Sequence, residues 1–200
     1  MKFFESNLQL YVAEHARRRT FIHAGVVGWR GCGVVIPGRS FSGKTTLVRE
    51  LVRAGATYYS DEYAVLDGRG LVHAFPKPLG IRDESSTKQT KQRAEAFGGR
   101  TGVTPLPVGL IVSSHFKLAL LANAVPARRD PGRTLATLRR VVLGAQVLRG
   151  IRGDAAEVAG TLLDRVRTAN RTIVTPRSRL CWGDELQRGV HHAQYSGDIP

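Results

Sequence analysis

IPGRSFSGKTTLVREL, which runs from Ile36 to Leu51, decides the fold of this chain. An apolar strand end leads into glycines and small polar residues, then into a lysine, two threonines and an amphipathic run. Residues 38–45 fit the pattern G-x-x-x-x-G-K-[ST] at every fixed position. In such a loop, backbone N–H groups curl around phosphate groups and the helix N-terminus adds partial positive charge. We therefore predict an α/β fold in which a phosphate-binding loop (P-loop) joins a strand to a helix over residues 44–54.

Individual roles follow from this pattern. The ammonium group of Lys44 is predicted to bridge the β- and γ-phosphates of a nucleotide, and the hydroxyl of Thr45 to bind Mg²⁺. An ordinary glycine turn before a helix is the alternative, and the flanking strand and helix patterns favour the phosphate loop. The residues predicted to contact the nucleotide are Gly38, Arg39, Ser40, Phe41, Ser42, Gly43, Lys44, Thr45 and Thr46.

A pair of acids follows one short strand beyond the predicted helix. Asp61 and Glu62 end the segment TYYSDE, and Asp61 lies 17 residues after Lys44. Both carboxylates would lie near the loop if the strands on either side of the helix are neighbours. One carboxylate would then orient and deprotonate an attacking hydroxyl while the other holds Mg²⁺. A solvated acidic turn is the alternative, and His23, in the strand before the loop, reads on its own as a packed residue.

Composition limits the class of protein. The 200 residues are enough for one domain with a sizeable core, and the net charge of +14 favours anionic partners such as nucleotides or acidic proteins. The sequence has no basic stripe interleaved with aromatic residues and no zinc-finger spacing, so nucleic-acid binding is a minor option. Two widely separated cysteines, Cys32 and Cys181, indicate a reduced, cytoplasmic protein. No apolar stretch is long enough to span a membrane.

Residues 1–175, including the loop and the acid pair, are predicted to form a single domain, and residues 176–200 are predicted to be a disordered tail. A first helix is expected over 6–18, a β-hairpin directly before the loop, a second hairpin around Asp67, and a lid-like loop over 85–102. The segment KLALLANAV reads as a buried helix that ends at Pro126. Two further helices begin after the caps Asp130 and Asp154, the first with Leu135, Leu138 and Val142 on one face.

The segment HAGVVGWRGCGVVIPGRSFSGKTTLVRELVRAGATYYSDEYAVLD, residues 23–67, resembles the catalytic domain of HPr kinase/phosphorylase and its shorter serine-kinase relatives. The shared pattern is the histidine at the start of the preceding strand, the phosphate loop, and the acid pair. That group shares a fold with the nucleotide-binding domain of ATP-dependent phosphoenolpyruvate carboxykinase. The resemblance covers about residues 8–167 and implies a mixed sheet with flanking helices.

The resemblance also implies roles. Asp61 would be the base that takes the proton from an acceptor serine, Glu62 would help hold the metal, and His23 would line the phosphate site. Arg82 matches an arginine after the hairpin and would contact the nucleotide. The implied ligands are ATP and Mg²⁺, the implied partner is a protein or peptide that carries an acceptor serine, and family precedent implies self-association.

Two departures from the family keep other functions open. The segment PLGIRDESS stands where the HPr enzymes carry a glycine-rich signature, and the segment between GLIVSSHF and KLALLANAV is shorter than in the relatives. A second hypothesis is therefore a regulatory module that binds a nucleotide without transferring phosphate. A third, weaker hypothesis is a P-loop ATPase whose basic surface binds nucleic acid.

Overall fold

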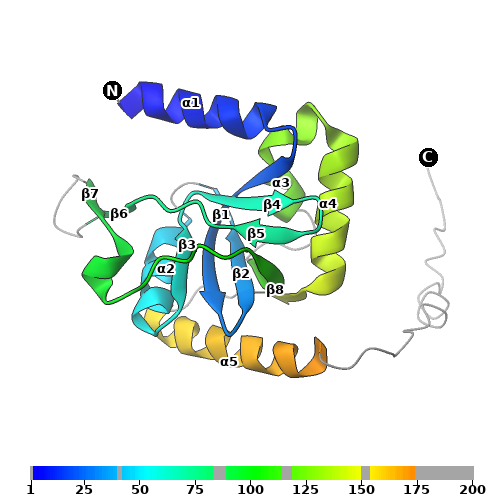
Figure 1. The fold of residues 1–200 in the computed structure, drawn as a ribbon. Coiled ribbons are helices and arrows are strands. Elements are labelled where there is room, and N and C mark those ends of the chain that lie inside the picture. Colours follow the sequence, from blue (N-terminus) through cyan, green and yellow to red (C-terminus); the bar gives the residue numbers. More distant parts are fainter. Residues whose placement is uncertain (1, 40–41, 83–88, 114–118, 150–153, 174–200) are drawn as a thin grey trace, which may run out of the picture.

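The computed structural model describes residues 2–39, 42–82, 89–113, 119–149 and 154–173 (Figure 1). The helices within these ranges are α1 (Lys2–His15), α2 (Lys44–Arg53), α3 (Ala119–Ala122), α4 (Pro131–Gly144) and α5 (Ala155–Ile173), with 3₁₀ turns at Ala94–Phe97 (η1) and Val125–Arg128 (η2). The strands are β1 (Arg19–Trp29), β2 (Cys32–Pro37), β3 (Thr57–Ser60), β4 (Tyr63–Asp67), β5 (Leu71–His73), β6 (Leu79–Arg82), β7 (Gln89–Gln92), β8 (Leu106–Ser113) and β9 (Gln146–Arg149). Across these ranges, no helix has the length and apolar character needed to cross a membrane.

Strand β1 organises the main sheet. Its first half pairs antiparallel with β4, and its second half pairs antiparallel with β2 on one side and β3 on the other. Strand β8 lies parallel to β2 and β9 and antiparallel to β5, which completes a seven-stranded sheet. Strands β6 and β7 form a separate antiparallel pair. The predicted mixed sheet with flanking helices is confirmed, and most of its pairings are antiparallel.

Both predicted hairpins are present. The β1–β2 hairpin turns at Arg30 and Gly31, whose φ angles of 48° and 80° match the left-handed conformation that two-residue hairpin turns require. The β4–β5 hairpin turns at Asp67, whose Oδ1 accepts hydrogen bonds from the backbone N–H groups of Arg69 and Leu71 at 2.9 and 3.0 Å. These local signals therefore fixed the strand pairing correctly.

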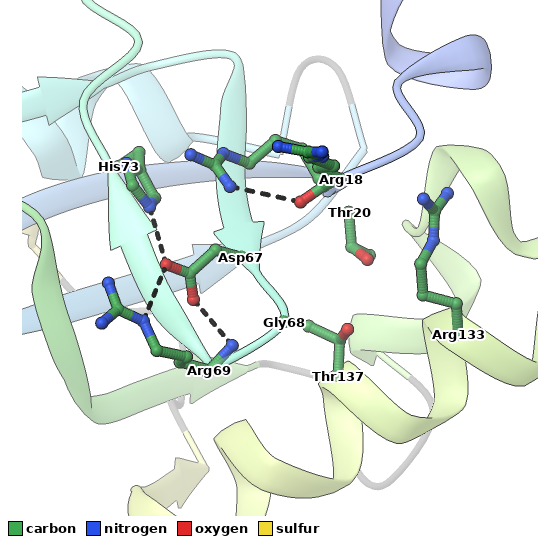
Figure 2. Close-up of a pocket in the computed structure, with 9 residues that line it drawn as sticks. Arg18, Thr20, Asp67, Gly68, Arg69, His73, Arg133 and Thr137 are labelled. Atoms are coloured by element: carbon green, nitrogen blue, oxygen red, sulfur yellow. Dashed lines mark hydrogen bonds and ion pairs between the residues drawn. The ribbon is translucent and has the colours of Figure 1, made fainter.

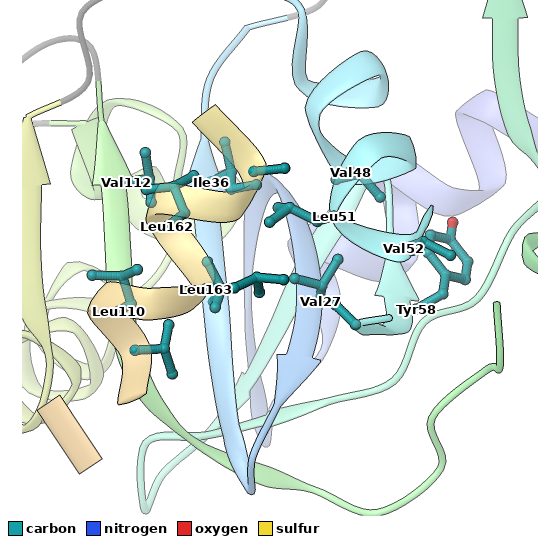
Figure 3. Close-up of a cluster of buried hydrophobic side chains, with 14 of the residues drawn as sticks. Val27, Ile36, Val48, Leu51, Val52, Tyr58, Leu110, Val112, Leu162 and Leu163 are labelled. Carbon is teal, nitrogen blue, oxygen red and sulfur yellow. The ribbon is translucent and has the colours of Figure 1, made fainter. Parts of the chain in front are cut away.

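Helices cover both faces of the sheet because side chains of a strand alternate between its faces. Along β2, Val34 and Ile36 pack with α2 and α5, whereas Val35 packs with the cluster that α4 covers. Figure 3 shows the first cluster, in which side chains of the strands meet those of α2 and α5. A third, smaller cluster joins Ala13 of α1 to Phe21 and Tyr63. The loop between β2 and α2 is thereby held between two packed elements.

The structure corrects several helix predictions. On α4 the buried residues are Thr134, Thr137, Leu138 and Val141, whereas Leu135 and Val142 are 52% and 46% exposed. The prediction was therefore correct for Leu138 and wrong for Leu135 and Val142, because two threonines, rather than leucine and valine, complete the buried face. In the described part of KLALLANAV, residues 119–125, the expected helix is the single turn α3, and Pro126 lies inside η2. The N-cap at Asp130 is confirmed, since its Oδ1 accepts from the N–H of Arg133 at 3.0 Å.

Other boundaries also differ from the prediction. The first helix spans Lys2–His15 rather than 6–18. The segment 85–102 was predicted to be a loop, but its described part contains β7 and η1, because Gln89–Gln92 pairs with β6. Residues 83–88 and the predicted tail 176–200 lie outside the described residues.

The corrected face of α4 gives a test of the packing. Leu138→Ala should lower the free energy of unfolding by about 2–5 kcal/mol, because it removes a buried side chain and leaves a cavity. The same substitution at the exposed Leu135 should change it by less than about 0.5 kcal/mol. Urea unfolding of the two variants measures both values, and equal losses would contradict this orientation of α4.

Candidate functional site

The loop between β2 and α2 is tight at both ends. At its start, a β-carbon on Gly38 would lie 2.7 Å from the Ser42 hydroxyl oxygen, so a larger residue there would require the Ser42 side chain to move. At its end, Gly43 adopts a left-handed conformation with φ 82° and ψ 6° and caps α2. The N–H of Ser42 donates to the carbonyl of Arg39 at 3.3 Å and closes the turn. Ser40 and Phe41, two of the predicted contact residues, lie outside the described residues.

The N-terminus of α2 has the character of an anion site. Among the described residues, no side chain caps its first N–H groups, and its first turn contains no acidic residue. Unpaired N–H groups and the helix dipole favour negative charge at this end. Thr46, the third residue of α2, is exposed there.

Lys44 is the first residue of α2 and is only 7% exposed. Its Nζ donates to the carbonyl of Arg39 at 2.6 Å, inside the loop that the lysine follows. Burial lowers the pKa of Lys44, and the nearby carboxylate of Asp61 opposes that shift. A lysine this buried is energetically acceptable because it has an acceptor and an acid close by.

Asp61 faces the start of α2. The hydroxyl of Thr45 donates to its carboxylate, at 3.0 Å from Oδ1 and 3.1 Å from Oδ2. Burial raises the pKa of Asp61 to about 6, although the Thr45 hydrogen bond and the charge of Lys44 pull in the opposite direction. The charge of Glu62 adds to the increase in this pKa. The carboxyl therefore exchanges its proton near neutral pH.

Local irregularity aims Asp61 at the helix. The pairing of β3 with β1 shifts register between Val26 and Val27, so that Tyr59 is an extra residue on β3. Directly after β3, the hydroxyl of Ser60 accepts from the N–H groups of Glu62 and Tyr63 at 3.2 and 3.0 Å. This turn holds the acid pair between β3 and β4.

His23, on β1, contacts the residue at which the loop starts, Gly38. Its Nδ1 is 2.7 Å from the carbonyl oxygen of Gly38. A carbonyl only accepts, so Nδ1 carries the proton and Nε2 is left as an acceptor. Burial lowers the pKa of His23, which keeps the ring neutral. The predicted proximity of His23 to the loop is thus present, and the histidine supports the loop backbone.

Glu62 is placed differently from Asp61. Its carboxylate forms an ion pair with Lys77, whose ammonium group also donates to the side chain of Gln9 on α1 at 2.7 Å. Sequence reasoning missed Lys77. Lys77 lies between two prolines, Pro76 and Pro78, which favour an extended backbone. This was the feature of the sequence that could have indicated a fixed position for Lys77. The hydroxyl of Tyr58 fixes that backbone by donating to the carbonyl of Lys77 at 2.6 Å.

A cleft of about 440 Å³ opens beside the loop. His23 and Arg39 form one wall, Leu10 and Glu14 of α1 form another, and residues 122–125 complete the lining. Arg82 is the last residue of β6, and its side chain lies outside the described part of the chain. The structure therefore brings together His23, Lys44, Thr45, Asp61 and Glu62 around one loop.

No family model matches this chain, and no curated protein matches it. Among solved structures, it is similar to the Hpr(Ser) kinase/phosphatase from Coxiella burnetii, at 17% identity and a TM-score of 0.47. The match covers 76% of this chain and 92% of that one. A likeness at this level assigns neither a family nor an activity to the chain.

The pKa of Asp61 has a consequence for stability. Because its folded pKa of about 6 exceeds the ordinary value of 3.8, the folded protein binds this proton more tightly than the unfolded chain. This carboxyl should therefore make stability fall as the pH rises from about 4 to 6, by up to about 3 kcal/mol. Asp61→Asn should remove that component, as measured by urea unfolding between pH 4 and 8. Wild-type and variant curves that stay parallel through this window would contradict the shift.

Proposed function

We propose that this protein is an ATP-dependent phosphotransferase that phosphorylates a hydroxyl group, most simply a serine, on a protein or peptide. The observation that carries the proposal is the contact between Thr45 and Asp61 beside the buried Lys44. It places a hydroxyl, a cation and a proton-accepting carboxyl at the N-terminus of one helix.

The loop and helix α2 would bind the phosphates of the nucleotide. Gly38 and Gly43 allow the tight backbone path, the uncapped N–H groups of α2 supply donors, and Lys44 supplies the positive charge. Lys44 would exchange its hydrogen bond with the Arg39 carbonyl for one with phosphate oxygens.

The residues present also fit Mg²⁺. The hydroxyl of Thr45, the second residue of α2, is an oxygen ligand beside the loop, and Mg²⁺ accepts one or two protein ligands when phosphates and waters complete its shell. In the described part of the chain, no group of three or more His, Cys, Asp or Glu residues could hold a metal without such help. When bound, Mg²⁺ would neutralise charge on the phosphates. Glu62 is proposed as the carboxylate ligand of the metal, and it would exchange its ion pair with Lys77 for that contact.

Asp61 is proposed as the base. The acceptor hydroxyl oxygen would attack the γ-phosphorus of ATP, the bond between that phosphorus and the β–γ bridging oxygen would break, and ADP would leave. The hydroxyl proton would pass to Asp61, whose pKa of about 6 suits a proton acceptor at neutral pH. The cleft bordered by His23 and Arg39 lies beside the loop and is proposed as the binding place of the acceptor.

The proposal is tested by phosphate transfer from γ-labelled ATP to a library of serine-containing peptides. Asp61→Asn should lower the transfer rate by at least about 100-fold, because it removes the proton acceptor, while nucleotide affinity stays within about threefold of wild type. Phosphoamino-acid analysis identifies the acceptor. Tight nucleotide binding with no transfer by the wild-type protein would overturn the kinase proposal and leave a nucleotide-binding module.

A Mg²⁺ titration distinguishes the roles of the proposed metal ligands from the role of the proposed base. Thr45→Val removes a proposed metal ligand at nearly constant volume and should raise the Mg²⁺ concentration for half-maximal transfer by about tenfold or more. Glu62→Gln should raise it as well if Glu62 reaches the metal. Thr161→Val, an exposed position on α5, is the matched control. A Thr45→Val protein with unchanged Mg²⁺ dependence would remove Thr45 from the metal site.

A further inference from the structure

A second cavity, of about 420 Å³, lies at the start of β1, beside Arg19 and Thr20 (Figure 2). Its lining comes from the link between α1 and β1, the β4–β5 hairpin and the N-terminal half of α4: Arg18, Arg19, Thr20, Asp67, Gly68, Arg69, His73, Arg133 and Thr137. None of these residues belongs to the loop or the acid pair described above. Arg19 is four residues from His23, or about 13 Å along an extended strand.

The cavity is strongly basic. Four arginines line it, against the single carboxylate of Asp67. That carboxylate is already engaged: its Oδ2 lies 3.0 Å from Nε2 of His73, and its Oδ1 accepts two backbone hydrogen bonds within the hairpin turn. Asp67 therefore shapes the wall of the cavity and offsets one of the four arginine charges, that of Arg69 at 3.7 Å.

The arginines of the cavity have few partners among the described residues, and Nη1 of Arg19 donates to the carbonyl of Arg18 at 3.2 Å. Among the described residues, no carboxylate lies within ion-pair distance of Arg18 or Arg19, and Arg69 lies 3.7 Å from Asp67 while remaining 78% exposed. Arg133 pairs through its Nε with Asp130 at 3.1 Å, which leaves the rest of its guanidinium group for another acceptor. Several arginines around one cavity, with few acids among them, are a typical arrangement for binding an anion.

Thr20 is the second, independent observation. It is 1% exposed, and its hydroxyl has no hydrogen-bond partner among the described residues. Figure 2 shows Thr20 between Arg18 and Arg133 on the wall of the cavity. Buried hydroxyls normally have a partner, and a lone one lining a basic cavity points to an acceptor supplied by a ligand.

We propose that this cavity binds the phosphate group of a small phosphate monoester or of inorganic phosphate. A phosphate dianion offers three terminal oxygens to several arginines at once, whereas a carboxylate would neutralise only one of them. The cavity has room for a phosphate and a few carbon atoms, and its described lining has no aromatic ring other than His73 on which a nucleobase could stack. The site stands independently of the proposed transfer reaction.

Residue-resolved NMR tests the proposal without reference to ATP. Inorganic phosphate and glycerol 3-phosphate are titrated separately into ¹⁵N-labelled protein at constant ionic strength, with glycerol as the neutral control. Saturable shifts should occur at the amides of Thr20, Gly68 and Thr137, and the tighter of the two probes identifies the source of the phosphate. The amide of Gly43 reports separately on the loop before α2.

Charge-neutral variants locate the site. Arg18→Gln and Arg133→Gln should each weaken phosphate binding by about tenfold or more, because each removes a charged hydrogen-bond donor. Arg139→Gln, an exposed arginine of α4 outside the cavity, should leave the affinity within about twofold. Equal weakening in all three variants, or shifts confined to Gly43, would overturn the cavity proposal while leaving the loop's proposed function intact.

Discussion

The hydrogen bonds of His23 and Ala24 on β1 are the constraint on which the candidate site depends. The carbonyl of His23 accepts from the N–H of Gly38, where the loop begins, and the N–H of Ala24 donates to the carbonyl of Glu62, in the acid pair. Two adjacent residues of one strand therefore tie down both halves of the site. The imidazole adds a further bond to the Gly38 carbonyl. Because these are mainly backbone contacts within a sheet, the distance between loop and acids is set by the fold rather than by flexible side chains.

The charges of Lys44 and Asp61 balance each other inside the site. Lys44 and Asp61 are both largely buried, and each opposes the shift that burial imposes on the other's pKa. A buried charge without such a partner would be costly. The arrangement limits the decrease in the pKa of Lys44 and leaves Asp61 able to exchange a proton near neutral pH. It also explains why the two groups would act together on a phosphate that arrives with negative charge.

Much of the fold was predictable because its signals are local. The left-handed glycines, the two-residue turn at Arg30 and the Asp130 cap each act within a few residues of sequence. The site was predictable as a set of residues, but the ion pair of Glu62 with Lys77 was not, since it depends on how the segment after β5 packs beside the acid pair. Likewise, the buried face of α4 could not be read from hydrophobicity, because Thr134 and Thr137 are buried there. Long-range packing decided these features.

The proposed function requires Lys44 and the loop before it to bind the phosphates of ATP. The most direct measurement is covalent labelling with an ATP acyl phosphate, which acylates a lysine only when its amine lies next to the bound phosphates, followed by peptide mass spectrometry. If Lys44 contacts the phosphates of bound ATP, it should be the main modified lysine, and excess MgATP should block its labelling. Absence of label on Lys44, or label that ATP does not compete away, would show that Lys44 does not contact those phosphates.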